Sequence, residues 1–415
     1  MQEFVQKFSI DFSFPVIFTR SVFSTENTSF LRTIRRQETG RRQRVLFIVD
    51  SNVAAAHPAL IDQIHTYVET FCESLQMVAT PLLVTGGEVS KNDLSNVLDL
   101  LAHLNRHGMD RQSFVVIIGG GAVLDMACFA AALTHRGVRT IRMPTTVLGQ
   151  GDSGVGVKNG INLFGKKNFI GTFVPPFAVI NDSAFIETGE HRDKISGIAE
   201  GVKVALLRDP EFFAFLQLNA EVLAVADLPA LQYTIRHSAE LHLRHIREAG
   251  DPFELGSSRP LDFGHWSAHK LESLTNHELR HGEAVAIGMA LDVIYSVKKR
   301  YLQRKTAERI LTLLEQLGFT LWSDTLAIPD DEGIPAVLAG IREFREHLGG
   351  RLHITLLRDN GQPFEVHEMD EALIVKSIET LHERSKRRLR NVIPDVPPPG
   401  FGLEARNCFR TVGSG

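Results

Sequence analysis

Three separated polar clusters carry the residue types that could bind a catalytic metal ion. Glu200 lies in IAEGVKVALL, His265 and His269 lie in DFGHWSAHKLE, and His281 lies in RHGEAVAIGM. Each cluster interrupts a mostly apolar run with helix-like spacing, where a buried polar group must be satisfied. One carboxylate and neutral imidazoles are typical of a Zn²⁺ site with three protein ligands and an open fourth position. The chain has 17 histidines, so for any single one of them a surface or capping position is the favoured alternative.

Length and composition restrict the class of protein. The 415 residues are 43% hydrophobic, which is enough for a large core and two domains. The net charge of −4 gives no general attraction to nucleic acid or to a membrane surface. No apolar run approaches the ~18 residues of a membrane span, and the first residues lack the pattern of a signal peptide. Cys72, Cys128 and Cys408 have no metal-type spacing and are typical of reduced thiols, so we expect a cytoplasmic protein.

The first half of the chain alternates short β-branched runs with helical patterns, which is typical of a parallel sheet covered by helices. The third expected strand runs into Gly119, Gly120 and Gly121 at the start of a helix. Backbone N–H groups exposed there could bind a pyrophosphate. A purely structural tight turn is the alternative, because the G-x-G-x-x-G spacing is absent. The expected strands are residues 44–50, 80–85, 114–118 and 140–143, and the expected helices are residues 60–75, 94–107 and 123–137.

The end of the first expected strand favours NAD⁺ as the nucleotide. Asp50 closes this strand, where an acidic side chain can bind the ribose hydroxyls of adenosine and disfavour a 2′-phosphate. Glu88 and Lys91 follow the second strand and could support the same cofactor, or could be a solvated loop pair. The predicted cofactor site also includes Asn52, Asp125, Thr145 and Thr146.

A glycine-rich polar stretch follows the fourth expected strand. Seven glycines lie between Gly149 and Gly171, and glycine lets the backbone approach a ligand closely. A plain surface loop is rarely this long and this rich in glycine, so we expect a loop that forms the floor of a site for a phosphorylated polyol. Charge and hydrogen bonds come from Asp152, Lys158, Asn162, Lys166, Lys167 and Asn168.

From about residue 185 the pattern becomes helical, with helices expected at residues 197–207, 230–249, 259–274, 281–298 and 307–317. This predicts an α/β domain at 1–182, an α-helical domain at 183–390 and a Pro-rich tail at 391–415, with 176–183 as the crossover. His265 and His269 are four positions apart and share one helical face. The cleft between the domains is where we expect the site.

Six ordered segments resemble the signature segments of the sugar phosphate cyclases, the family of 3-dehydroquinate synthase. The resemblance runs from about residue 44 to 360 and implies a Rossmann-like nucleotide-binding domain joined to an α-helical metal-binding domain. It implies tightly bound NAD⁺, Zn²⁺ or Co²⁺ held by Glu200, His265 and His281, and a homodimer. The segments are GGGAVLDMACFAAALTHRG, PTTVLGQGDSGVGVKNGIN, GKKNFIGTF, IAEGVKVALLRDPEFF, DFGHWSAH and RHGEAVAIGM.

The chemistry of this family involves no net redox change. A hydroxyl is oxidised by NAD⁺, phosphate is eliminated, the hydride is returned, and the opened sugar closes by an intramolecular aldol step. The resemblance places a phosphate, or hydroxyls beside it, near Arg136, Lys158, Asn168 and His269. It places substrate hydroxyls near Lys203, Lys167 and Asp152. Asn162 is assigned to the substrate site, and the predicted catalytic group comprises Asp152, Lys158, Lys203, Asp262 and His269.

This chain departs from the 3-dehydroquinate synthase pattern at positions where that enzyme binds its substrate. That enzyme binds the substrate carboxylate with an arginine where this chain has Ser258, and it has asparagine where this chain has Asp262. Arg244 is expected to replace a lysine that also serves the carboxylate. Losing a cation and adding a carboxylate disfavours an acidic substrate, so we expect a neutral ketose phosphate. His347 is expected beside its phosphate.

RPLDFGH and EFREHLGG are similar to the branch that cyclises sedoheptulose 7-phosphate to valiolone-type cyclitols. His269 favours the members that make 2-epi-valiolone, since those making 2-epi-5-epi-valiolone tend to have proline there. Three alternatives stay open at this point: a 3-dehydroquinate synthase, a metal-dependent polyol dehydrogenase and a non-catalytic binding relative. We expect no nucleic-acid or membrane partner.

Overall fold

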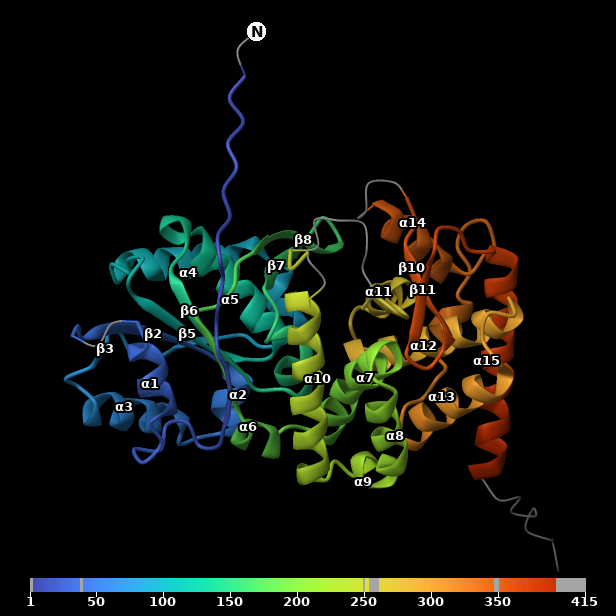
Figure 1. Ribbon diagram of the computed structural model, residues 1–415, viewed down its shortest axis with the longest axis horizontal. Coiled ribbons are helices and arrows are strands. Elements are labelled where there is room, and N and C mark those ends of the chain that lie inside the picture. The colour runs from blue at the N-terminus through green and yellow to red at the C-terminus, as the bar shows by residue number, and fades with distance from the viewer. Residues whose placement is uncertain (1–2, 38–39, 249–250, 254–260, 347–350, 393–415) are drawn as a thin grey trace, which may run out of the picture.

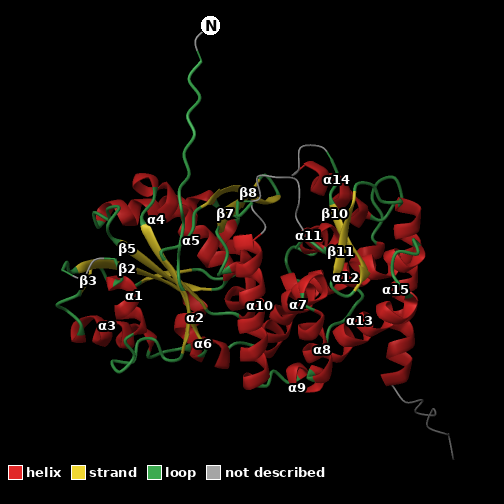
Figure 2. Cartoon of the chain, viewed as in Figure 1, coloured by secondary structure: helices red, strands yellow, loops and turns green. Residues whose placement is uncertain are grey.

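The computed structural model describes residues 3–37, 40–248, 251–253, 261–346 and 351–392. A part built on a sheet and a part built mainly of helices lie side by side, with α10 (Leu228–Glu248) along their boundary (Figure 1). Most of the strands gather in the first part (Figure 2). The Pro-rich tail predicted at 391–415 lies almost wholly outside the described residues.

A seven-stranded parallel sheet forms the centre of the first part. The strand order is β1-β9-β6-β5-β2-β3, and β4 also pairs with β2. Because the strands are parallel, the carboxyl ends of β2, β5 and β6 meet at one edge, where α/β sheets bind ligands. The strands are β1 (Val16–Thr19), β2 (Gln43–Asp50), β3 (Leu75–Met77), β4 (Leu82–Val84), β5 (Phe114–Gly119), β6 (Arg139–Pro144) and β9 (Ala178–Asp182).

Helices cover both faces of this sheet, which explains the nearly continuous apolar run of β2. Successive side chains of a strand point to opposite faces. Phe47 and Val49 pack with α1 and α3, whereas Leu46 and Ile48 pack with α4 and α5. The helix predicted at 60–75 ends earlier, because the chain turns into β3. The helices of this part are α1 (Ser29–Arg35), α2 (Ser51–Ala56), α3 (Leu60–Thr70), α4 (Leu94–Arg106) and α5 (Gly121–Leu133).

Two predictions for residues 149–183 were wrong. The expected glycine-rich loop is a π-helical turn, η3 (Gly149–Ser153), followed by an antiparallel hairpin of β7 (Lys158–Leu163) and β8 (Lys166–Phe173). Here the glycines serve strand packing, since a Cβ on Gly160 would lie 2.4 Å from the carbonyl oxygen of Ile170. The expected crossover at 176–183 contains β9, an inner strand of the sheet.

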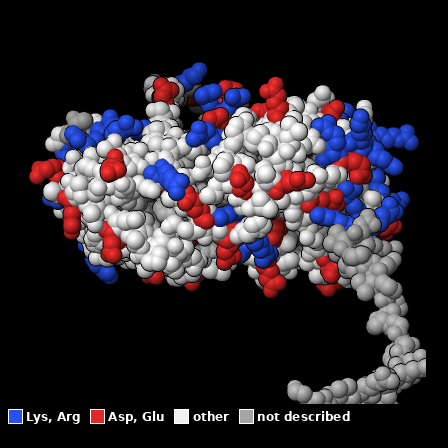
Figure 3. Space-filling view, turned by 90° about the horizontal axis from the view of Figure 1, so that it is seen from below, with Lys and Arg blue, Asp and Glu red and all other residues white. Residues whose placement is uncertain are grey.

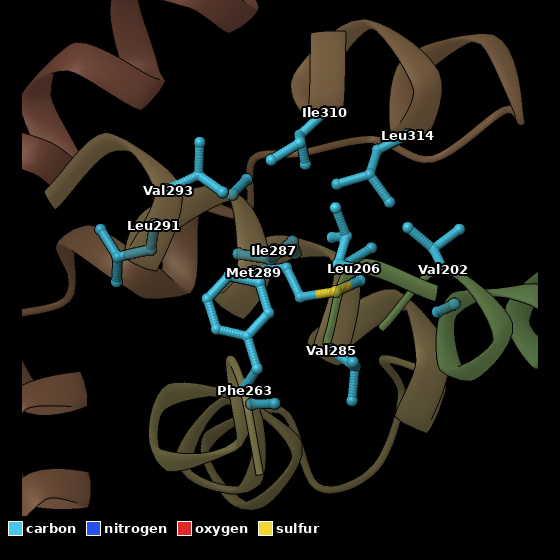
Figure 4. Close-up of a cluster of buried hydrophobic side chains, with 14 of the residues drawn as sticks. Val202, Leu206, Phe263, Val285, Ile287, Met289, Leu291, Val293, Ile310 and Leu314 are labelled. Carbon is cyan, nitrogen blue, oxygen red and sulfur yellow. The ribbon is translucent and has the colours of Figure 1, made fainter. Parts of the chain in front are cut away.

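The second part is helical, as predicted, and its core lies where α7, α12 and α13 meet. Val202 and Leu206 of α7, Ile310 and Leu314 of α13 and apolar side chains of α12 gather in one cluster (Figure 4). A two-stranded ribbon of β10 (Ile354–Asp359) and β11 (Gln362–Val366) is added to the expected helices. The remaining helices are α6 (Ala184–Glu187), α7 (His191–Arg208), α8 (Pro210–Leu218), α9 (Ala220–Ala224), α11 (His265–Leu274), α12 (His281–Lys298), α13 (Arg304–Gln316), α14 (Ala339–Glu346) and α15 (Glu371–Val392).

The surface carries charges of both signs. Lys and Arg side chains are interspersed with Asp and Glu over the face seen in Figure 3. Arg384 of α15, for example, donates to Glu308 and Glu315 of α13. No helix in the described part of the chain is both long and apolar enough to cross a membrane.

Candidate active site

Glu200, His265 and His281 converge from three helices. Glu200 lies in the middle of α7, while His265 and His281 are the first residues of α11 and α12. Glu200 Oε1 is 3.4 Å from His265 Nε2 and 3.2 Å from His281 Nε2. One ligand atom from each residue lies within 4.8 Å of the others. Since the Glu200 side chain is only 3% exposed, its charge must be met by positive groups rather than by water.

The second nitrogen of each imidazole already has a partner. A carbonyl oxygen only accepts, so His265 Nδ1 donates to the Phe263 oxygen at 3.1 Å. His281 Nδ1 lies 3.1 Å from Glu272 Oε2. Both Nε2 atoms are thereby left to face the Glu200 carboxylate, as in metal sites whose imidazoles are oriented through their other nitrogen. These three residues fit a divalent metal ion such as Zn²⁺ or Co²⁺.

The acidic neighbours of His281 favour the protonated, positively charged form of its ring. Burial lowers the pKa of His281, but the charge of Glu272 and hydrogen bonds with Glu200 and Glu272 outweigh it and raise the pKa to about 9. A proton therefore occupies this ring when no metal ion does.

Glu272 is a site residue that the sequence analysis missed. Its side chain is 4% exposed, and Glu272 Oε1 accepts a hydrogen bond from Lys167 Nζ at 2.8 Å. Burial raises the pKa of Glu272, but the charges of His281 and Lys167 reverse this and hold the pKa well below its usual range. The available signal was its spacing, because Glu272 is seven positions after His265 and so two turns along the same helical face.

Close backbone contacts set the distance between the helices that carry the ligands. A Cβ on Gly282 would lie 1.8 Å from the Ser196 carbonyl oxygen, so α12 touches α7 directly beside His281. Gly264, at φ +78°, precedes His265, and a Cβ on Gly288 of α12 would lie 2.0 Å from the Gly264 oxygen. Larger residues at these glycines would push the three ligands apart.

Asp292 holds the turn on which His265 stands. It is fully buried in α12 and accepts hydrogen bonds from Gly264 N at 3.0 Å and from Trp266 Nε1 at 2.9 Å. These two donors flank His265 in the sequence. Burial raises the pKa of Asp292 to about 7, against the opposing effect of the two hydrogen bonds.

Asp292→Asn should remove a pH dependence of stability. Because the folded-state pKa is raised, the favourable contribution of the protonated carboxyl is fully present below about pH 4 and is lost as the pH rises through about 7. Relative to wild type, the variant should therefore gain up to about 4 kcal/mol in free energy of unfolding across this window, on top of a constant cost for one lost hydrogen bond. Urea unfolding at several pH values measures this, with Asp62→Asn as a surface control. A pH-independent difference between wild type and Asp292→Asn would contradict it.

A cavity of about 1220 Å³ is lined by His269, the neighbour of the metal-type cluster formed by Glu200, His265 and His281. The hairpin β7–β8 forms one side, and α10 and α11 form the other. The His269 ring centroid is 5.3 Å from that of His265 and 6.2 Å from that of His281, so the cluster lies directly behind His269. Burial lowers the pKa of His269 well below its usual range, which keeps this imidazole neutral. The predicted site residues in the lining are Asp125, Asp152, Lys158, Asn162, Lys166, Lys167, Asn168 and His269.

Lys203 joins the metal-type cluster to the predicted catalytic acids. It is buried, and its ammonium contacts Glu200 Oε2, while Oε1 of the same carboxylate faces the histidines. Burial lowers the pKa of Lys203, but the charges of Glu200, Asp152 and Asp262 outweigh it and raise the pKa. Lys203 is therefore a fixed positive charge between these three acids.

The helix α10 presents His242 to the cavity rather than Arg244, whose contact with substrate stays a prediction. His242 lines the cavity, with Nδ1 2.8 Å from Asp152 Oδ1. Arg244 is exposed and is absent from the described cavity lining. Two positions along a helix turn a side chain by about 200°, so these two residues point to opposite faces.

Some of the predicted ligands make hydrogen bonds that hold the hairpin to the segment after β4. Asn162 was expected to bind substrate, but its Nδ2 donates to Glu88 Oε1 and Asn92 Oδ1, both at 2.8 Å. Its Oδ1 accepts from the Asn168 backbone N–H at 2.8 Å. Because both amide donors are used within the protein, Asn162 positions the hairpin.

Lys91 makes a similar connection. Its ammonium is 2.7 Å from Asp125 Oδ2 and also donates to Asn168 Oδ1. The Lys91 side chain is 3% exposed, so it is not a solvated loop residue. It ties η1 (Glu88–Lys91) to α5 and β8 at the edge of the cavity.

Asp50 connects two segments of the predicted cofactor site. It ends β2, is 5% exposed, and accepts a hydrogen bond from Asn52 N at 2.9 Å, which caps α2. Burial raises the pKa of Asp50, while backbone hydrogen bonds, including one from Gly120, oppose the rise. Asp50 thus holds the glycine turn, and its contact with a ribose stays a prediction.

The three glycines at the start of α5 differ in what they permit. A Cβ on Gly119 would lie 2.9 Å from Val123 Cγ1, and one on Gly121 would lie 2.8 Å from Ser153 Oγ. A Cβ on Gly120 would meet only Thr146 Cγ2, at 3.4 Å. A Cβ is therefore crowded at Gly119 and Gly121 but has room at Gly120, the N-cap of α5. The open approach at this helix start fits the pyrophosphate of a dinucleotide.

Arg136 lies away from the cavity formed by its own chain. It is exposed and follows α5, which begins at the carboxyl edge of the sheet and runs back to the amino edge. Residues after such a helix lie at the far edge of the sheet, so Arg136 is remote from the cavity of its own chain, and its phosphate contact stays a prediction. Thr145 and Thr146 do lie at the carboxyl edge, where the Thr145 N–H donates to the Gly119 oxygen at 3.0 Å. His347 lies outside the described residues.

Comparison with known proteins agrees with this arrangement. Residues 81–196 match the N-terminal family model of 3-dehydroquinate synthase, and residues 197–334 match the C-terminal one. The 3-dehydroquinate synthase of Acidithiobacillus ferrooxidans is 32% identical over 82% of this chain and 89% of that protein. The 2-epi-valiolone synthase of Actinosynnema mirum is 34% identical over 63% of this chain and 69% of that protein.

Solved structures extend the likeness to the whole fold. The 2-epi-5-epi-valiolone synthase ValA of Streptomyces hygroscopicus, with NAD⁺ and Zn²⁺ bound, matches with a TM-score of 0.81 and 25% identity over 92% of this chain and 100% of that one. The glycerol dehydrogenase of Schizosaccharomyces pombe, at 15% identity over 94% of this chain and 96% of that one, shares the fold alone with a TM-score of 0.60. The two family models and the identity to curated relatives show that this chain belongs to the 3-dehydroquinate synthase-like family of sugar phosphate cyclases.

Proposed function

We propose that this protein is an NAD⁺- and metal-dependent cyclase that converts sedoheptulose 7-phosphate to a valiolone-type cyclitol and phosphate. The observation that carries the proposal is the convergence of Glu200, His265 and His281 behind a cavity lined by lysines. The related ValA structure holds NAD⁺ and Zn²⁺, which supports the same cofactors here.

The metal ion would lower the pKa of a coordinated substrate hydroxyl, and the nicotinamide would take up and return a hydride. Glu200, His265 and His281 would hold the metal, and the N-terminus of α5 at Gly120 would hold the pyrophosphate. The residues of the chain then perform binding and orientation. Lys158 and Lys167 supply positive charge to the phosphate, and charge placed in advance stabilises a departing anion.

Polar groups on the opposite wall would orient the sugar. Neutral His269 can donate and accept a hydrogen bond at once through its two nitrogens. Asp152, fixed by His242 at 2.8 Å, offers carboxylate oxygens to substrate hydroxyls. Lys203 lies beside Asp152 and Asp262, and its ammonium, held positive by these acids, can donate hydrogen bonds to the same hydroxyls.

The residue types near the start of α11 support a neutral substrate. Asp262 places a negative charge three residues before His265, and its field reaches Lys203. Ser258 lies outside the described residues, but serine cannot pair with a carboxylate as an arginine does. His269 supports 2-epi-valiolone as the product. The identity to a 3-dehydroquinate synthase keeps that activity as the second candidate.

Product analysis tests the reaction class. Purified protein with NAD⁺, Zn²⁺ or Co²⁺ and sedoheptulose 7-phosphate should release one phosphate for each sugar consumed. Absorbance at about 340 nm should not rise, because NADH is reoxidised within each turnover. A polyol dehydrogenase would instead accumulate NADH and release no phosphate, and that outcome would overturn the proposal.

Gly120→Ala tests the nucleotide site. The variant should fold with unchanged stability, because the new Cβ has room beside Thr146, yet its methyl group would occupy the approach to the helix start. NAD⁺ affinity should fall roughly tenfold or more, about 1.4 kcal/mol. Calorimetric titration with NAD⁺ measures this, and Gly40→Ala, where a Cβ meets nothing within 4 Å, is the matched control. Unchanged NAD⁺ affinity would place the nucleotide elsewhere.

A further inference from the structure

A second group of metal-type ligands lies on the β10–β11 ribbon, apart from the active site. The strands are antiparallel, with Ile354 opposite Val366 and Thr355 opposite Glu365. Continuing this register places His353, just before β10, opposite His367, just after β11. Because side chains alternate between the faces of a strand, His353, Glu365 and His367 all project from one face.

The three side chains meet closely at the open end of the ribbon. One ligand atom from each lies within 4.8 Å of the others. His353 Nδ1 is 3.2 Å from Glu365 Oε2, and the two imidazole centroids are 4.7 Å apart. His367 Nδ1 donates to the Leu352 carbonyl oxygen at 2.9 Å, so the lone pair of this ring is on Nε2. The same arrangement, an imidazole fixed through one nitrogen by a carbonyl, orients His265 in the active site.

The three side chains of this group differ in how deeply they are buried. The His353 side chain is 6% exposed and that of Glu365 is 30% exposed, while His367 is exposed. An ion bound here would therefore have protein on one side and an open coordination position toward water. Two imidazoles and one carboxylate suit Zn²⁺, Co²⁺ or Ni²⁺ and suit Mg²⁺ or Ca²⁺ poorly.

The rest of the ribbon is attached to the helices of the active site. Ile354 and Leu356 point away from the cluster and belong to the same core as α7 and α12. At the opposite end of the ribbon, the Gly361 N–H donates to the Leu206 carbonyl oxygen of α7 at 2.7 Å. The turn end is thus fastened to α7, and the two histidines lie at the end where the strands separate.

We propose that His353, Glu365 and His367 bind a second divalent transition-metal ion that clamps the open end of the β10–β11 ribbon. The ion joins residues on both strands, so its binding stabilises the folded ribbon by mass action. This site is separate from the Glu200 cluster and does not depend on the proposed cyclase reaction.

Titration of metal alone tests the proposal without sugar or NAD⁺. The background is His281→Ala, which lacks a complete Glu200 cluster, freed of metal by a chelator. Calorimetric titration with Zn²⁺ should give one equivalent per chain. Adding His367→Ala should remove it, with affinity falling roughly 100-fold or more. His367 is the exposed ligand, so its removal creates no cavity in the core.

Glu368→Gln is the matched control, since Glu368 is exposed, adjacent and outside the cluster. It should leave one equivalent of Zn²⁺ in the same background. Zn²⁺ should also raise the midpoint of thermal unfolding of His281→Ala but not that of His281→Ala/His367→Ala. Absence of Zn²⁺ binding to His281→Ala, or binding that survives His367→Ala, would overturn the proposal. His367→Ala alone should keep full turnover, so loss of cyclase activity in other tests bears only on the proposed function.

Discussion

Replacing His281 by alanine should abolish turnover while the protein stays folded. The side chain is 23% exposed at the start of α12, so its removal opens no cavity in the core. What is lost is one of the three groups facing a common point, and with it the charge that the buried Glu200 carboxylate requires. We expect kcat to fall by at least about 10³-fold, or ~4 kcal/mol. Phosphate release with sedoheptulose 7-phosphate measures the loss.

Measuring the metal content distinguishes loss of the metal ion from a general loss of folding. Wild-type protein should retain an ion at the Glu200 cluster after dialysis, and His281→Ala should lose that ion without losing circular dichroism or thermal cooperativity. His65→Ala, a partly exposed histidine of α3, is the control and should keep both metal and turnover. If His281→Ala retained the metal content and rate of wild type, Glu200, His265 and His281 would not form the catalytic centre.

Sedoheptulose 7-phosphate should be preferred over the carboxylated heptulosonate phosphate, the precursor of 3-dehydroquinate. Asp262 contributes a negative charge near the cluster, and the chain has Ser258 where an arginine would pair with a carboxylate. A desolvated carboxylate placed in this field would meet roughly 3 kcal/mol of unfavourable electrostatics, a factor of at least ~10² in kcat/KM. Parallel assays of phosphate release with the two sugars measure the ratio.

Two variants test whether these residues cause the preference. Asp262→Asn should reduce the ratio, and Asp262→Asn combined with Ser258→Arg should reduce it further. The ratio is the informative quantity, because Asp262 also acts on Lys203 and its removal can slow both substrates alike. Efficient conversion of the heptulosonate phosphate by the unmodified protein would contradict this preference and would favour 3-dehydroquinate synthase as the function.

Much of the architecture and of the metal-type cluster was available from the sequence. The spacing of apolar residues predicted α12 over residues 281–298, as observed, and predicted α4 and β5 to within one residue. Glu200, His265 and His281 were recognised because charged and imidazole side chains stand out in apolar helical runs. Such signals are local, since the periodicity of a helix or strand and the polarity of a single residue can be read without knowing any partner.

The tertiary structure decided what depends on partners distant in sequence. Residues 158–173 form a hairpin because β7 and β8 pair, and 178–182 form an inner strand because β1 and β6 flank them. Glycine spacing is compatible with a loop or with close strand packing, and only the pairing distinguishes the two.

Tertiary packing also determined which of several candidate residues reach the site. The rotation of α10 against the turn Gly149–Ser153 brings His242, and not Arg244, to Asp152. The packing of α11 against α12 and β8 places Glu272 between His281 and Lys167. Sequence spacing determines which residues share a helical face, whereas the packing of that helix against its neighbours determines which face meets the cavity.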